Sequence, residues 1–297
     1  MTLNQERRLT YALEPTTPSL PLPPGACDTH VHVFGPSARF PLAASGKTMP
    51  ADAPKETLYA LHQRLGIQRC VIVQSAVHGF DNAATEDAIA HGGGRYLGVA
   101  LVPLTVSDEA LQRLARVGFR GVRFNFMKHL APAGGIDEIV AFTRRLAPIG
   151  LHLQVHFDSD LIHRLAGPLA QSAVPVVIDH MGRVDASLGP DHADFAALHQ
   201  LMRNPLFRMK VSGVDRISPF APGQAAPDYR SGIALAQRLV RDFPERCFWG
   251  SDWPHPNHTH VPDDGALVNA LAKIAPDPAV RALLLVQNPQ TFYRFEA

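Results

Sequence analysis

The chain has 297 residues, 46% of them hydrophobic, and a formal net charge of +1. This length suits one large α/β domain, and the near-neutral charge argues against a nucleic-acid surface. The sequence has no run of 18 apolar residues and no signal-like apolar segment near residue 1, so we expect a cytoplasmic protein without membrane contact. The three cysteines, Cys27, Cys70 and Cys247, are widely spaced, which predicts free thiols in a reducing compartment.

Residues 1–25 are polar and then proline-rich, which predicts an extended arm ahead of a single catalytic domain spanning 26–297. Short apolar runs then alternate with stretches that read as helices. The predicted strands are 26–34, 70–77, 96–102, 121–127, 151–157, 174–180, 207–214 and 247–253. The predicted helices are 55–65, 82–92, 107–117, 136–147, 160–171, 192–203, 229–242 and 264–275. Eight consecutive β/α units predict an α/β protein of the (β/α)8 barrel (TIM barrel) class.

Polar residues recur near the carboxyl ends of the predicted strands, which is where barrel enzymes build their active sites. They are His30, His32, Ser75, His78, Arg123, Asn125, His156, His180, Ser212 and Asp252, with Arg183, Asp215 and Arg216 just beyond strand ends. Strand alternation puts Asp28, His30 and His32 on one face and turns Asp179 away from His180. The proline- and glycine-rich segment 218–229 is a candidate lid.

Four other histidines fall in or at the ends of predicted helices. They are His62, His91, His192 and His199. A histidine in such a place is most often a surface residue, so we expect all four at the surface.

Three motifs, D-x-H-x-H at 28–32, IDHMGR at 178–183 and WGSDWPHPN at 249–257, resemble the amidohydrolase superfamily. Together with HVFGP, DNAATEDAIA and GVRFNF they resemble its branch of small lactone hydrolases, which includes pyrone dicarboxylate lactonases and sulfomuconolactone hydrolases. The likeness runs from residue 25 to about residue 293. It implies a distorted barrel and the hydrolysis of a cyclic ester from aromatic or sugar-acid catabolism.

The departures from the pyrone dicarboxylate lactonases, which work without metal, bear on the cofactor and the substrate. This chain has His156 where they have a tyrosine, His129 where they have a substrate-binding arginine, and Ala76 where they have a serine. In metal-dependent members of the superfamily the strand-five position is a zinc ligand. The resemblance therefore implies one divalent metal, zinc, and the shell His30, His32, His156 and Asp252 offers donors that suit it. The bridging strand-four lysine of two-metal members has no match.

The expected reaction is the opening of a small anionic lactone, sulfomuconolactone-like or carboxylated, by a metal-activated water. Asp252 and His180 are the expected catalytic residues, Asp252 as proton shuttle and His180 at the carbonyl oxygen. The expected substrate-binding residues are Arg123, Arg183, Arg216, His129, Lys128, Ser75 and His78.

Three alternatives stay open. They are a metal-independent lactonase of the pyrone dicarboxylate type, a zinc-dependent decarboxylase on the same ligand set, and a barrel that binds without catalysis. The oligomeric state is also left open by the sequence.

Overall fold

The computed structural model describes residues 7–43, 49–127, 134–219 and 228–296, and its core is one parallel sheet of eight strands in the order β1 to β8. The strands are β1 (Cys27–Val31), β2 (Arg69–Val73), β3 (Tyr96–Leu101), β4 (Phe119–Phe126), β5 (His152–Phe157), β6 (Val176–Ile178), β7 (Phe207–Lys210) and β8 (Cys247–Phe248). Thr29 donates its backbone N–H to the carbonyl of Trp249 (2.9 Å), and Asp252 donates to that of His30 (2.8 Å). These bonds join β1 to the segment after β8 and close the sheet, which confirms the predicted (β/α)8 barrel.

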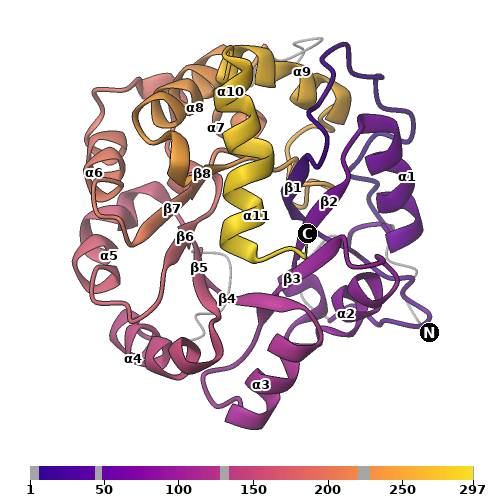
Figure 1. The fold of residues 1–297 in the computed structure, drawn as a ribbon, viewed down its shortest axis with the longest axis vertical. Coiled ribbons are helices and arrows are strands. Elements are labelled where there is room, and N and C mark those ends of the chain that lie inside the picture. The colour runs from indigo at the N-terminus through magenta and orange to yellow at the C-terminus, as the bar shows by residue number, and fades with distance from the viewer. Residues whose placement is uncertain (1–6, 44–48, 128–133, 220–227, 297) are drawn as a thin grey trace.

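The eight predicted helices all form, with each end within two residues of its predicted place, and they surround the sheet (Figure 1). They are α1 (Lys55–Leu65), α2 (Ala83–Ala90), α3 (Asp108–Arg116), α4 (Ile136–Leu146), α5 (Ile162–Leu169), α6 (Ala193–Leu201), α8 (Arg230–Asp242) and α9 (Asp264–Ile274). The structure adds the short helices α7 (Val214–Ile217), α10 (Pro278–Ala282) and α11 (Asn288–Tyr293). In the described part of the chain, no helix combines the length and apolarity needed to cross a bilayer.

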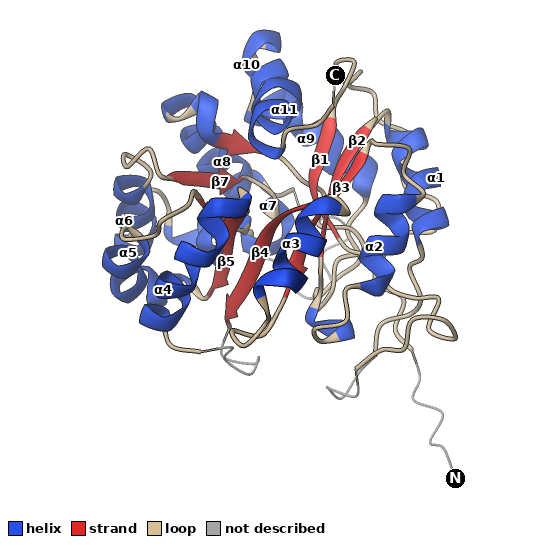
Figure 2. Cartoon of the chain, turned by 60° about the horizontal axis from the view of Figure 1, so that its bottom comes forward, coloured by secondary structure: helices blue, strands red, loops and turns tan. Residues whose placement is uncertain are grey.

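One end of the barrel is sealed by the C-terminal helices. In Figure 1, α10 and α11 lie across the middle of the ring of strands. The ring of Tyr293 on α11 lies 5.4 Å from that of Phe248 on β8 and 5.5 Å from that of His152 at the start of β5. Figure 2 shows β4 and β5 pointing away from this end. A site at the carboxyl ends of the strands therefore opens on the opposite side of the molecule.

The described part of the N-terminal arm lies on the barrel beside the turn after β8 and helix α9. The ring of Tyr11 packs 5.1 Å from that of Trp253. Farther along, Thr16 donates its N–H and its hydroxyl to the carboxylate of Asp263, both at 2.9 Å. These contacts hold the arm against the segment that follows the last strand.

Five strands end two or more residues earlier than predicted. Strands β1, β2, β6, β7 and β8 stop at Val31, Val73, Ile178, Lys210 and Phe248, whereas apolar continuity predicts strands as far as 34, 77, 180, 214 and 253. Beyond these ends, His180 (φ 48°) and Asp252 (φ 68°) adopt left-handed backbone angles that no strand allows. Apolar side chains continue past the last ladder bond because the turns after it are buried as well.

His62 corrects the prediction that it lies at the surface. Its side chain is buried under α1, and its Nδ1 lies 2.9 Å from the hydroxyl of Tyr96 on β3. Desolvation lowers the pKa of His62 to about 3. The helical spacing carried this signal, because His62 lies on the face of α1 that also buries Leu58, Leu61 and Leu65.

We expect the His62→Asn variant to lose less stability in acid than the wild type. The pKa of His62 in the fold, about 3, is below the 6.5 of an unfolded histidine, so protons bind preferentially to the unfolded chain. The stability due to neutral His62 is complete above pH 6.5 and is lost as the pH falls toward 3. Between pH 7 and pH 4.5 the wild type should lose roughly 2 kcal/mol more than the variant in urea unfolding.

A matched control for this effect is His91→Asn. His91 ends α2 with its side chain exposed, so its substitution should leave the acid dependence of the wild type unchanged. Equal losses for wild type and His62→Asn over this range would show that His62 does not cause the effect.

Candidate active site

Three imidazoles converge on one carboxylate oxygen at the open end of the barrel. Asp252 Oδ1 lies 3.4 Å from His32 Nε2, 3.6 Å from His180 Nε2 and 3.7 Å from His30 Nε2. All four side chains are almost completely buried. Burial of polar groups costs free energy unless they are hydrogen-bonded or bind a ligand. This arrangement therefore indicates a functional site rather than core packing.

The opposite nitrogen of each ring has its own partner. His32 Nδ1 lies 2.7 Å from the carbonyl of Val73, and His180 Nδ1 lies 2.9 Å from the hydroxyl of Ser212. His30 Nδ1 lies 3.2 Å from Asp179 Oδ1. Donation from Nδ1 to the Val73 carbonyl leaves a lone pair on Nε2 of His32. His30 Nδ1 also lies 3.4 Å from Lys210 Nζ.

The turns after β6 and β8 bring these residues together. Both His180 and Asp252 have positive φ, which reverses the direction of the chain at the strand ends. Asp179 and His180 consequently both reach the site, and the prediction that Asp179 points away from it is wrong. Alternation holds only inside a strand, and β6 ends at Ile178.

Asp252 is held ionised by Arg216. Arg216 donates to Asp252 Oδ2 through Nε (2.9 Å) and through a second, shorter contact from Nη2, which also donates to the carbonyl of Pro256 (3.1 Å). Burial alone would raise the pKa of Asp252, but Arg216 and the three histidines hold that pKa well below its usual range. The carboxylate therefore presents Oδ1 to the imidazoles as a permanent negative charge.

A second buried ion pair lies beneath His30. Asp179 accepts a hydrogen bond from Arg123 Nε (2.8 Å), and Lys210 Nζ lies 3.8 Å from its other oxygen. Lys210 also donates to the carbonyl of Thr29 (2.8 Å) and to Gln154 Oε1 (3.0 Å). Burial lowers the pKa of Lys210 to about 8. Arg123, predicted to bind substrate, thus has at least part of its guanidinium engaged by Asp179.

Sequence reasoning missed Lys210 and Asp179. The signal for Lys210 was a lysine in β7, "FRMK", whose neighbours on the sheet are apolar. The signal for Asp179 was its place in the same turn as His180.

The donor set fits a divalent metal. His30, His32 and Asp252 each offer one ligand atom, and the three atoms lie within 4.8 Å of one another. His30 Nε2 and Asp252 Oδ1 are buried and have no hydrogen-bond partner. Desolvation lowers the pKa of His30 to about 3, which keeps its ring neutral and able to bind metal. Two imidazoles and a carboxylate are the donors that zinc prefers at a catalytic site.

His156, the fourth predicted ligand, lies next to this group but outside it. Its ring is 5.4 Å from that of His180, and its Nδ1 lies 3.3 Å from Asn125 Oδ1. Its Nε2 is buried and has no hydrogen-bond partner. Desolvation keeps the pKa of His156 well below its usual value, so this nitrogen is an available lone pair or donor beside the site.

The other residues predicted to bind substrate differ in burial and in whether their polar atoms already have partners. Arg183 is half-buried after the His180 turn, and burial lowers its pKa to about 10. His78 has both nitrogens near backbone groups, Nδ1 at 3.0 Å from the Pro41 carbonyl and Nε2 accepting from Gly35 N–H at 3.3 Å. Ser75 caps the short helical turn that carries His78. Lys128, His129 and most of the candidate lid lie outside the described residues.

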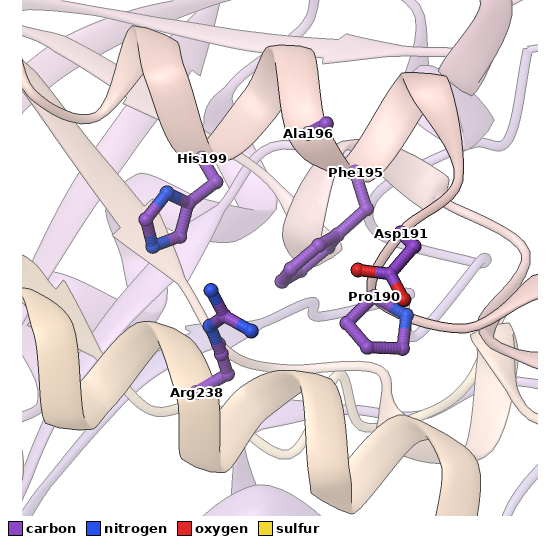
Figure 3. A pocket seen from close by; sticks show the side chains of 6 residues that line it. All are labelled: Pro190, Asp191, Phe195, Ala196, His199 and Arg238. Atoms are coloured by element: carbon purple, nitrogen blue, oxygen red, sulfur yellow. The ribbon is translucent and has the colours of Figure 1, made fainter.

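A surface pocket of about 250 Å³ lies elsewhere, between α6 and α8 (Figure 3). Two of its polar side chains are already paired, because His199 Nε2 (2.8 Å) and Arg238 Nε (3.3 Å) both contact Asp242. It includes none of the converging residues, so we do not assign the chemistry to it.

Comparison with known proteins agrees with this geometry. The amidohydrolase family model (Amidohydro_2) matches residues 27–295. A 2-pyrone-4,6-dicarboxylate hydrolase of Comamonas testosteroni is 41% identical over 96% of this chain and 95% of its own length. A 4-sulfomuconolactone hydrolase of Hydrogenophaga intermedia is 38% identical over 92% of this chain and 89% of its own.

Among solved structures, a "probable 2-pyrone-4,6-dicarboxylic acid hydrolase" of Acinetobacter baumannii, with citric acid bound, superposes with a TM-score of 0.80. It is 26% identical and covers 91% of this chain and 100% of that one. The fold, the converging histidines and aspartate, and these matches show that the chain belongs to the amidohydrolase family.

Proposed function

We propose that this protein is a hydrolase that opens an anionic lactone of the type for which its relatives are named, a sulfonated or carboxylated ring from aromatic or sugar-acid catabolism. The observation that carries the proposal is the convergence of three buried imidazoles on Asp252 Oδ1 at the open end of the barrel. The names of relatives 41% and 38% identical supply the substrate class.

Asp252 is the proposed proton shuttle. Hydrolysis forms a bond between the carbonyl carbon and a water oxygen and breaks the bond from that carbon to the ring oxygen. Asp252 takes the proton that the water loses and returns it to the departing ring oxygen, which becomes a hydroxyl group. Its depressed pKa keeps it ionised for the first transfer and makes it a strong proton donor for the second.

His180 is the proposed partner of the carbonyl oxygen. Its Nε2 is held 3.6 Å from Asp252 Oδ1, and its other nitrogen is fixed by Ser212. A group fixed in this way stabilises the charge that develops on the oxygen without having to reorganise during the reaction.

The proposed metal ligands are His30, His32 and Asp252, with His156 as the outlying member of the predicted set. A divalent metal bound there would acidify a water and polarise the lactone carbonyl. The groups behind the proposed ligands suit this role, because the Val73 carbonyl and the Asp179 carboxylate contact the Nδ1 atoms of His32 and His30. The competing hypothesis is a metal-independent lactonase, and its support is Arg216, which already compensates the charge of Asp252.

The test is a direct assay of the purified protein with 4-sulfomuconolactone and 2-pyrone-4,6-dicarboxylate. Ring opening should release one proton and give a hydroxy or enol acid without gas. Release of CO2 from a carboxylated substrate would instead identify a decarboxylase. If neither lactone nor a panel of simpler anionic lactones is opened, the proposed function is wrong.

Arg183→Met should raise KM for an anionic lactone at least about tenfold and leave KM for a neutral lactone nearly unchanged. Arg183 makes no ion pair with any described carboxylate, and it follows directly from the turn that carries His180. Its guanidinium is therefore available for a substrate anion. The exposed Arg203, changed to Met, is the control and should alter neither constant. Equal effects of Arg183→Met on both substrates would make Arg183 a structural residue.

A further inference from the structure

A second group of metal-type donors lies near Arg216, which donates to Asp252 and to the carbonyl of Pro256. It consists of Asp215 on α7 and of His255 and His258 in the turn after β8. One ligand atom from each lies within 4.8 Å of the others, and all three residues are buried. The proposed reaction uses none of them.

These donors have unused valence. His258 Nε2 and Asp215 Oδ2 form a close ion pair of 2.6 Å. Asp215 Oδ1 and His255 Nδ1 are buried without a hydrogen-bond partner. Buried ring nitrogens and carboxylate oxygens that keep free lone pairs, such as His255 Nδ1 and Asp215 Oδ1, are atoms able to bind a metal ion.

His255 has the support that a metal-binding histidine needs. Its Nε2 lies 3.0 Å from Asp264 Oδ1, and both side chains are completely inaccessible. Donation from Nε2 to this carboxylate leaves the lone pair on Nδ1, the atom that faces the group. A carboxylate behind a histidine ligand is the common second layer of zinc sites.

The local charge also calls for a cation. Asp215 and Asp264 add two buried carboxylates here, and the Arg216 guanidinium is hydrogen-bonded to Asp252. A divalent ion would compensate this negative charge. His255 (φ 58°) and Asn257 (φ 59°) have left-handed backbone conformations. The residue between them, Pro256, accepts a hydrogen bond from Arg216 through its carbonyl.

We propose that Asp215, His255 and His258 form a second, separate site for a zinc-like divalent cation. Two imidazole nitrogens and one carboxylate oxygen select zinc over calcium or magnesium, which prefer oxygen ligands. An ion there would tie α7 to the turn that carries Asp252, which Arg216 on α7 already contacts.

The experiment counts metal in protein that has been stripped with a chelator, reloaded with Zn2+ alone and desalted. The wild type should hold two zinc ions per chain by mass spectrometry of the metal. His258→Gln and Asp215→Asn should each hold one. Asp264→Asn should bind the second ion about 10–100 times more weakly, because His255 loses its support. The control is His199→Gln, which removes a histidine–aspartate pair of similar length (2.8 Å) on the outside of the barrel and should keep both ions.

His32→Gln separates this proposal from the proposed function. Loss of one ion in His32→Gln and of the other in His258→Gln supports both sites. A single wild-type ion that His32→Gln loses and His258→Gln keeps overturns the second site and leaves the proposed function intact. A single ion with the opposite behaviour supports the second site and removes the metal from the proposed reaction.

Crystals of the reloaded wild type give a readout that does not depend on how the variants fold. Anomalous scattering at the zinc edge should place a peak between Asp215, His255 and His258. The absence of a peak there, with zinc bound elsewhere or nowhere, overturns the inference.

Discussion

Asp252→Asn should lower kcat for the lactone at least about 10³-fold, because the amide keeps the volume of the side chain but can no longer accept the proton. The same change removes one anionic donor from the group of His30, His32 and Asp252. The fold should persist, since the amide oxygen can still accept a hydrogen bond from Arg216. Retention of more than a tenth of the wild-type kcat would exclude Asp252 as the proton shuttle.

Two measurements make this loss interpretable. Circular dichroism and the melting temperature of Asp252→Asn report whether the turn after β8 survives. Asp191→Asn, at an exposed position beside α6, is the matched control and should keep full activity. A folded Asp252→Asn protein without activity, next to an active Asp191→Asn protein, assigns the effect to the site.

The fold could be predicted in nearly every element because each strand of a (β/α)8 barrel is covered on both faces. Continuous apolar runs such as "VVI" in β6 therefore stand out between the amphipathic helices. Strand ends were less predictable. The apolar runs continue into buried turns at Val211 and Trp249, where hydrogen-bond geometry rather than composition decides where the ladder stops.

The candidate site could be predicted in part, because polar residues are conspicuous in strands that are otherwise apolar. His30, His32, His180 and Asp252 stood out as polar residues at strand ends, and the structure brings them together. Asp179 was missed because a left-handed turn, not a strand, decides where it points. Lys210 was missed because a lysine at the end of a strand usually extends to solvent, whereas this one is enclosed by Thr29, Gln154 and Asp179.

Removal of the proposed metal should abolish most activity, and binding of the metal should require His32. Dialysis against a strong chelator should lower kcat at least about 10²-fold, and Zn2+ should restore it. His32→Gln should lose one equivalent of zinc and stay inactive after zinc is added. The physical reason is that His32 Nδ1 is fixed by the Val73 carbonyl, so its Nε2 is pre-oriented toward Asp252.

The His156→Tyr variant tests whether His156 is a metal ligand, as the strand pattern predicts, or lies outside the donor group, as it does in the structure. The pattern and the family resemblance make His156 a metal ligand, so its replacement should release the ion. In the structure the three-donor group is complete without His156, whose Nδ1 lies near Asn125 instead. We therefore expect His156→Tyr to keep its zinc while kcat falls, because the buried Nε2 beside His180 is lost as a contact for the substrate. The zinc content of His156→Tyr, measured beside that of His32→Gln, tests this expectation.

Release of zinc by both variants would show that His156 becomes a ligand when metal binds. An active native enzyme without metal, indifferent to chelators, would leave the histidines as groups that polarise the carbonyl and Asp252 as the only base.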